Sequence, residues 1–147
     1  MLLYKVKTYK ELTKEDLYNL LQLRSEVFVV EQVCVYQDID GKDQKALHVL
    51  GYKEEKLIAY TRLFKSGDYF NKASIGRVVV KENYRHHKYG YEIMQVSIKA
   101  IKEHFRETEI KISAQCYLKK FYNGLGFNEV GEEYLEDGIP HIAMVLT

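Results

Sequence analysis

A basic turn in the middle of the chain carries the residue types that bind phosphate. It reads Arg85-His86-His87-Lys88-Tyr89-Gly90, follows a β-branched run at 73–80 and leads into an apolar-periodic segment at 91–105. A strand that enters a helix through such a turn leaves backbone N–H groups unpaired at the positive end of the helix dipole. Arginine holds two phosphate oxygens in a fork, and lysine adds a point charge. The turn therefore predicts a phosphate site, although a solvated basic loop has the same composition.

The elements that position this turn are predicted from hydrophobic periodicity. Alternating and β-branched runs predict strands at 2–10, 46–52, 56–64, 73–80, 109–115, 127–135 and 139–146. Helices are predicted after Thr13, where Asp16 completes a capping box, and at 91–105 and 118–125, with Gly126 as the C-cap of the last. Because a helix joins the strands at 73–80 and 109–115, these two strands are expected to be parallel. The pattern predicts an α/β (α+β) fold.

Length, charge and cysteine content exclude several classes of protein. The 147 residues suit a single domain, 1–147, with a substantial core. A net charge of +1 argues against general binding to nucleic acid or to a membrane surface. Cys34 and Cys116 are too few for a disulfide framework, and no Cys/His cluster has zinc spacing. No metal is therefore expected. No stretch has the length of a membrane span and the start does not read as a signal peptide, so we expect a cytoplasmic protein.

The segment from Val33 to Asp43 is acidic and rich in turn-forming residues, and it is expected to be too irregular for regular secondary structure. Loops of this kind often contact substrates. The pattern Asp38-x-Asp40-Gly41-x-Asp43 is superficially similar to a calcium loop, but it lacks the glutamate at the twelfth position and the glycine spacing. Calcium binding is therefore not predicted.

Several motifs resemble those of one family. The pattern Arg85-x-x-x-x-Gly90 after a strand resembles the Arg/Gln-x-x-Gly-x-Gly/Ala loop of the GNAT superfamily of acetyl-CoA-dependent N-acetyltransferases, with Lys88 in place of the first glycine. The run Phe121-Tyr122-Asn123-Gly124-Leu125-Gly126-Phe127 resembles the signature that ends the GNAT core. With the segments at 28–32, 36–41 and 136–142, these motifs resemble the ElaA-like branch, spread from Phe28 to Met144. The resemblance implies a mostly antiparallel sheet with a splayed parallel central strand pair and helices on both faces.

The resemblance also implies where acetyl-CoA, as co-substrate, would bind. In GNAT proteins the pantetheine arm lies in the gap between the two splayed strands, which here are the strands at 73–80 and 110–115. Backbone groups of Val78, Val79 and Val80 would face that arm. The diphosphate would be held by the turn and the start of the helix, which comprise Arg85, His86, His87, Lys88, Tyr89, Gly90 and Tyr91. Cys116 stands where many members have an asparagine that contacts the cofactor.

Tyr122 matches the tyrosine that many GNAT enzymes use as a general acid. Attack of an amine on a thioester expels a thiolate, which leaves more easily when a phenol delivers a proton. A tyrosine on an amphipathic helix is also an ordinary core residue. The acceptor ammonium must in turn lose a proton to a base. The candidate bases are Glu31, Asp38, Asp40, His48 and His141, of which Glu31 and His141 are preferred.

The predicted function is direct transfer of acetyl from acetyl-CoA to a primary amine on an unidentified small molecule or peptide. A non-catalytic CoA-binding regulatory module on the same fold is the alternative. A nucleotide-binding domain ranks last, because the chain has no Gly-x-x-x-x-Gly-Lys-Ser/Thr loop. The acidic segment 31–43 favours a cationic acceptor. The C-terminal hairpin could pair with a second copy in a homodimer.

Overall fold

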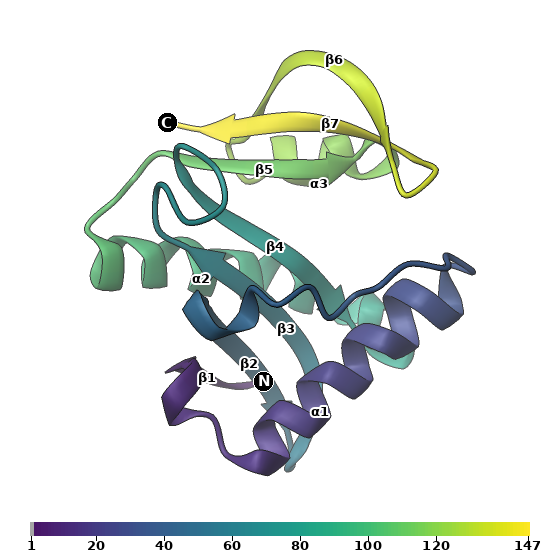
Figure 1. The fold of residues 1–147 in the computed structure, drawn as a ribbon, viewed down its shortest axis with the longest axis vertical. Helices are drawn as coiled ribbons and strands as arrows, with labels where there is room; N and C mark the ends of the chain where they lie inside the picture. Colours follow the sequence, from purple (N-terminus) through teal and green to yellow (C-terminus); the bar gives the residue numbers. More distant parts are fainter. Residues whose placement is uncertain (1) are drawn as a thin grey trace.

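A computed structural model describes residues 2–147 and shows a seven-stranded sheet flanked by helices (Figure 1). The strands are β1 Leu3–Thr8, β2 Leu47–Lys53, β3 Lys56–Phe64, β4 Ala73–Val80, β5 Ile110–Gln115, β6 Asn128–Glu136 and β7 Ile139–Leu146. The helices are α1 Lys14–Arg24, α2 Tyr89–Phe105 and α3 Lys119–Asn123. A π-helical segment, Ser25–Glu31, continues α1, and short 3-10 turns lie at Tyr9–Glu11, Asp43–Lys45, Glu82–His87 and Cys116–Leu118.

The sheet has the order β1-β2-β3-β4-β5-β7-β6, and its neighbours are antiparallel except for the pair β4 and β5. This confirms the predicted mixed α/β fold with one parallel pair. The pairing of β4 with β5 is confined to Ala73 with Ile110 and Ser74 with Lys111. By contrast, β5 pairs with β7 from Ile110 to Gln115. Beyond Ser74 the two parallel strands therefore separate, as the resemblance implied.

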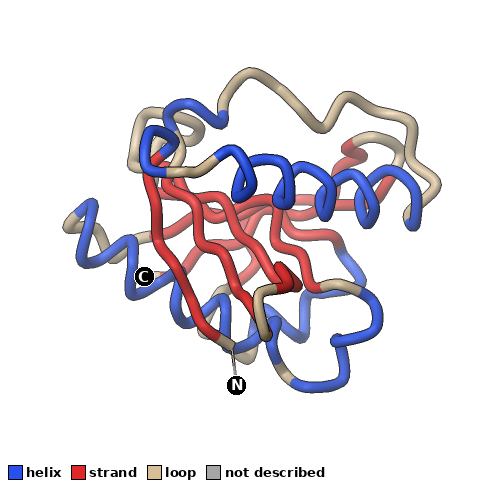
Figure 2. Tube along the Cα trace, turned by 90° about the horizontal axis from the view of Figure 1, so that it is seen from below, coloured by secondary structure: helices blue, strands red, loops and turns tan. Residues whose placement is uncertain are grey.

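The two large helices cover opposite faces of the sheet (Figure 2). On one face, Leu20 and Val27 of the first helix and its continuation pack with Tyr60 of β3. On the other face, Ile93 and Met94 of α2 belong to a larger core, which α3 joins through its own buried residues.

The capping box is confirmed, because the Asp16 amide donates to Thr13 Oγ1 at 3.0 Å and the Thr13 amide donates to Asp16 Oδ2 at 3.1 Å. None of the described helices is long and apolar enough to cross a membrane.

Some predicted boundaries were wrong. The end of the first helix was not predicted: the helix changes to π winding at Ser25 and runs on to Glu31. The segment 33–43 is irregular up to the 3-10 turn at Asp43–Lys45, as expected. The second helix begins at Tyr89 and not at 91, because Lys88 adopts a left-handed conformation and becomes its N-cap. The third helix ends at Asn123, before the expected C-cap Gly126, which lies in the following turn with φ +100°.

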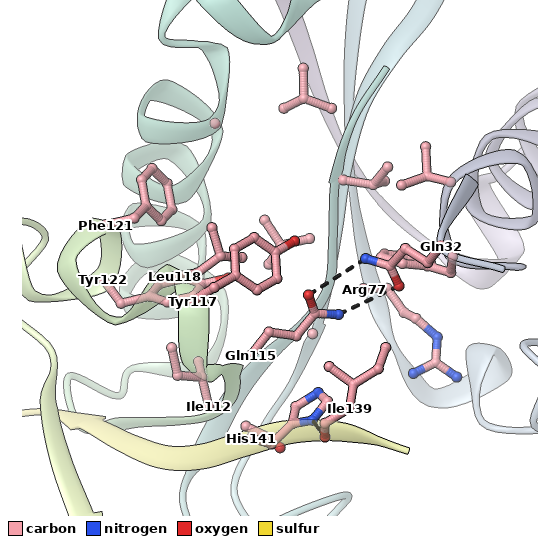
Figure 3. A pocket seen from close by; sticks show the side chains of 18 of the residues that line it. Gln32, Arg77, Ile112, Gln115, Tyr117, Leu118, Phe121, Tyr122, Ile139 and His141 are labelled. Atoms are coloured by element: carbon pink, nitrogen blue, oxygen red, sulfur yellow. Dashed lines mark hydrogen bonds between the residues drawn. The ribbon is translucent and has the colours of Figure 1, made fainter. Parts of the chain in front are cut away.

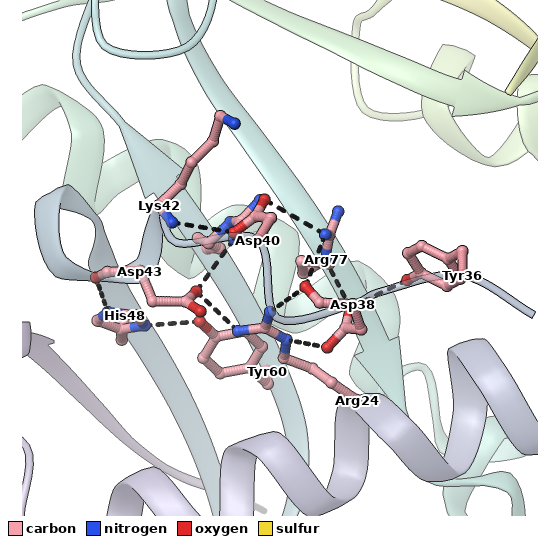
Figure 4. Close-up of polar contacts among 10 residues, drawn as sticks. Arg24, Tyr36, Asp38, Asp40, Lys42, Asp43, His48, Tyr60 and Arg77 are labelled. Carbon is pink, nitrogen blue, oxygen red and sulfur yellow. Dashed lines mark hydrogen bonds and ion pairs between the residues drawn. The ribbon is translucent and has the colours of Figure 1, made fainter. Parts of the chain in front are cut away.

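A buried ionic network holds the loop after the first helix against the sheet (Figure 4). Its members are Arg24, Arg62, Arg77, Asp38, Asp40 and Asp43. Arg24 is fully buried and donates from Nε to Asp38 Oδ2 at 2.8 Å and from Nη1 to Asp43 Oδ1 at 2.8 Å. A buried charge is tolerated only when it is paired and hydrogen-bonded, so removing one partner leaves the other charge buried and unpaired. The network thus fixes the position of the loop.

Candidate active site

The separation of β4 from β5 opens a cavity of about 920 Å³. Its walls come from the end of the first helix, the loop after it, β4, the start of α2, β5, the segment before and within α3, and the β6–β7 hairpin. A cavity of this size falls in the range of ligand pockets in proteins. Figure 3 shows it from close by, with residues from β5, α3 and β7 around it.

Most of the predicted cofactor-binding residues line this cavity. They are Val78, Val79, Val80, Arg85, His86, Lys88, Gly90 and Tyr91. The structure places the other two outside the lining. His87 is exposed and packs on the ring of Tyr89 with centroids 5.4 Å apart. Tyr89 is buried, and its hydroxyl accepts a hydrogen bond from Lys53 Nζ at 3.2 Å.

The start of α2 has the geometry of an anion site. Lys88, its N-cap, has φ +62° and ψ +20°, and no side chain caps the helix start. The first N–H groups of a helix lack intrahelical acceptors and carry the positive end of the dipole. Left-handed backbone is costly for a residue with a Cβ and free for glycine. This explains physically why a glycine suits the position that Lys88 occupies in the motif.

Arg85 contacts the residue that was predicted as a base. Its Nη1 and Nη2 donate to the two carboxylate oxygens of Glu31, at 2.5 and 2.7 Å, and its Nε donates to the Val80 carbonyl at 2.9 Å. The pKa of Arg85 is raised, chiefly by the hydrogen bonds to Glu31. Two predicted site residues, from the first helix and from the turn after β4, are therefore joined at the edge of the cavity.

Tyr122 lies in the wall of the cavity, with its ring buried among aromatic residues. The ring meets those of Phe121 and Phe127 edge-on, at centroid distances of 5.0 and 6.1 Å. Among the described residues, its hydroxyl has no hydrogen-bond partner. Burial raises the pKa of Tyr122 well above 10, with a smaller contribution from Tyr117. The phenol therefore keeps its proton at all ordinary pH values.

His141 on β7 also lines the cavity and has a defined tautomer. Its Nδ1 lies 2.7 Å from the Ile139 carbonyl oxygen, which can only accept, so Nδ1 carries the hydrogen. The lone pair of the neutral ring is then on Nε2, which lies 3.6 Å from Glu136 Oε2. The other oxygen of Glu136 accepts from Ser113 Oγ at 3.1 Å. This arrangement can accept a proton at Nε2 and stabilise the resulting imidazolium with a carboxylate.

The remaining candidate bases do not line the cavity. Asp38 and Asp40 are committed to the buried arginines of the ionic network. His48 is fully buried and binds the Tyr60 hydroxyl at 2.6 Å and the Asp43 carbonyl at 3.0 Å (Figure 4). Burial lowers the pKa of His48. These three residues hold the structure together around the site.

Several polar residues of the cavity were missed by the sequence analysis, and four of them surround the gap between the first helix and the β5–β7 pair. These four are Gln32, Ser113, Gln115 and Glu136. The side-chain amides of Gln32 and Gln115 face each other at 3.5 Å, across the gap between the first helix and β5 (Figure 3). Alternation along β5 offered a clue, because Ser113 and Gln115 share the face opposite to the buried Ala114. Nothing local indicated that this face would meet the helix end.

Comparison with known proteins gives consistent matches over nearly the whole chain. A family described as acetyltransferase (GNAT) domain matches residues 8–147. Protein ElaA from Escherichia coli (strain K12) is 46% identical over 138 residues, which cover 92% of this chain and 90% of that protein. A protein described as UPF0039 protein C11D3.02c, from Schizosaccharomyces pombe, is 37% identical over 142 residues, covering 95% of this chain and 93% of that protein.

Solved structures agree with these matches. The crystal structure of Escherichia coli ElaA has a TM-score of 0.93 and 42% identity over all of both chains. An acyl-CoA N-acyltransferase from Pseudomonas aeruginosa also has a TM-score of 0.93, with 39% identity over all of both chains. An acetyltransferase of the GNAT family from Staphylococcus aureus has a TM-score of 0.75 at 13% identity, covering 98% of both chains, and shares the fold alone.

Proposed function

The chain belongs to the GNAT acetyltransferase family, in its ElaA-like branch, and on this premise we propose that it moves the acetyl group of acetyl-CoA directly to a primary amine. The observation that supports this most is the cavity where β4 leaves β5, because it joins a neutral phenol, a histidine with a free Nε2 and a basic turn in one space. The acceptor would be an amine on a small molecule or a peptide.

The residues around the cavity fit acetyl-CoA. Beyond Ser74 the edge of β4 that faces β5 has no ladder partner in β5. Backbone groups of 78–80 on this edge would therefore bind an amide-bearing arm, except that the Val80 carbonyl already accepts from Arg85 Nε. The cavity runs from that edge to the turn that contains Arg85 and Lys88 and to the start of α2. Cationic side chains beside a helix start suit a diphosphate. When bound, acetyl-CoA supplies an activated acetyl thioester.

The side chains supply the proton transfers that this reaction requires. Because burial raises the pKa of Tyr122, its phenolic oxygen keeps a proton, and it would deliver this proton to the sulfur as the thiolate leaves. His141 would take the proton from the acceptor ammonium at Nε2, since an alkylammonium has no lone pair with which to attack. A backbone N–H of Val78 or Val79 would stabilise the negative charge on the carbonyl oxygen. Of the two preferred bases we favour His141, because its Nε2 carries the lone pair and lies 3.6 Å from Glu136, which would stabilise the protonated ring.

A thioester-consumption assay tests the proposal. The protein is mixed with acetyl-CoA and with a panel of polyamines, aminosugars, lysine-containing peptides and peptides with a free N-terminus, and release of free thiol is followed. We expect amine-dependent thiol release and an acetylated amine detected by mass spectrometry. CoA binding without turnover on any amine would instead favour the non-catalytic module. Failure to bind CoA would refute both.

A further inference from the structure

The bridge between Glu31 and Arg85 occupies the fork formed by Nη1 and Nη2 of an arginine that the proposed function needs to bind phosphate. Glu31 accepts from both terminal nitrogens of the guanidinium, and the Val80 carbonyl accepts from Nε. A guanidinium fork matches a carboxylate and a phosphate in the same way. An anion that enters from the cavity can therefore use this fork only if the carboxylate of Glu31 moves away.

The winding of the first helix brings Glu31 to this position. In an α-helix, residues five apart point about 140° away from each other, at 3.6 residues per turn. The segment Ser25–Glu31 is π-helical, with bonds between residues five apart, so Glu26 and Glu31 lie on one side. Both face the end of β4 and the turn after it: Glu26 binds Lys81 at 2.8 Å, and Glu31 binds Arg85.

The two ion pairs, Glu31 with Arg85 and Glu26 with Lys81, differ in their position relative to the cavity. Glu31 and Arg85 line the cavity, whereas Glu26 and Lys81 do not. The side chains of Arg85 and Glu31 are 41% and 30% exposed, so the bridge is open to anions from solution and from the cavity. An exposed ion pair is weak enough to be exchanged for a stronger anionic partner.

We propose that Glu31 is an internal competitor of the cofactor diphosphate at Arg85, and that cofactor binding releases its carboxylate into the cavity. This inference rests on the proposed function. The released carboxylate lies in the same cavity as Glu136 and Asp137, without its cationic partner. An unpaired carboxylate attracts an ammonium group, so the cofactor and a cationic acceptor bind with positive coupling. The first substrate thereby prepares the site for the second.

Calorimetry with matched variants tests the competition. The probes are CoA, pantetheine, which lacks the diphosphate, and inorganic pyrophosphate, which lacks everything else. Glu31→Gln removes the competing charge with little change of size, so we expect CoA and pyrophosphate to bind about threefold to fivefold more tightly, the scale of one exposed ion pair. Pantetheine binding should not change. Glu26→Gln, which removes the neighbouring pair outside the cavity, should leave all three affinities at the wild-type value.

Two further measurements make the test decisive. Glu31→Ala should tighten CoA and pyrophosphate binding as Glu31→Gln does, and thermal unfolding confirms that both variants are folded. In an Arg85→Ala background, Glu31→Gln should no longer have an effect. Equal or weaker binding of pyrophosphate by Glu31→Gln, or no binding at all, overturns the competition. If no variant binds CoA, the proposed function fails, and the pyrophosphate measurement still decides whether Glu31 competes at Arg85.

Discussion

Replacing Tyr122 by phenylalanine removes one hydroxyl group and little else. The ring is 6% exposed and keeps its edge-on contacts with Phe121 and Phe127 in the variant. No described residue hydrogen-bonds the hydroxyl, so its removal leaves no donor or acceptor unpaired in the protein. The free energy of unfolding should therefore change by less than about 1 kcal/mol.

The effect on catalysis should be much larger. General acid catalysis by a positioned side chain contributes about 10²- to 10⁴-fold in rate, which corresponds to about 3–5 kcal/mol of the barrier at 1.36 kcal/mol per tenfold. We expect Tyr122→Phe to lower kcat by about 100-fold or more, with the Kd for CoA unchanged. Because burial raises the pKa of Tyr122, the acid stays protonated as the pH rises, and the wild-type rate should show no loss from its deprotonation below about pH 10.

The assay compares thioester consumption with CoA binding and thermal unfolding in the same preparations. Tyr117→Phe is the matched control, since this neighbouring phenol also lines the cavity but is 73% exposed. It should retain a rate close to that of the wild type. A Tyr122→Phe variant that turns over at the wild-type rate would refute the assignment of the acid. An equal loss in both variants would show that the rate responds to the cavity in general.

Three other predictions follow from the site and its supports. Arg85→Ala should weaken CoA binding by about tenfold and leave pantetheine binding unchanged, because a charge-assisted hydrogen bond to phosphate is lost and Glu31 already offsets part of its contribution. Calorimetry that shows equal losses of affinity for both ligands would contradict the phosphate contact. The pKa of Asp40 is lowered to about 2, because its bonds with Arg62 outweigh the opposing effect of burial. The stability that Asp40 contributes, about 2 kcal/mol, should be present above pH 4 and lost as the pH falls toward 2. The free energy of unfolding in urea should therefore change less between pH 7 and pH 3 in Asp40→Asn than in the wild type. An equal change in both proteins would contradict this. Lys88→Gly should relieve the strain of the left-handed backbone, although glycine also stabilises the unfolded chain by increasing its conformational entropy. The net effect should raise the free energy of unfolding in urea titrations by up to about 1 kcal/mol. A loss of stability would show that the lysine side chain supports the turn.

Most of the framework could be read from the sequence, because the information is local. The strand-forming residues of Lys56–Phe64 and the β-branched run at Ala73–Val80 predicted strands that the structure confirms. The Thr13 capping box predicted the start of the first helix for the same reason, since both partners lie within one turn. The π winding that carries the first helix on to Glu31 was not predicted, since no pattern in the sequence indicated it.

In the candidate site, too, some features could be predicted from the sequence and others could not. The residue types of the basic turn indicate phosphate binding by their chemistry, whereas the proton-transfer role of Tyr122 is implied by the resemblance of its segment to GNAT proteins. The fate of each acidic residue did not follow from the sequence: Asp38 and Asp40 are held in the ionic network, and Glu31 meets an arginine 54 positions away.

By itself, then, the sequence determined which strands and helices form and which side chains are chemically able to act. Only the tertiary structure decided that β4 and β5 part after Ser74, that Nε2 of His141 is left with the lone pair, and that Arg85 already holds an anion. The physical reason is range. Secondary structure and capping depend on neighbours a few residues apart, whereas a cavity and the partners of a charge depend on which distant segments the sheet brings together.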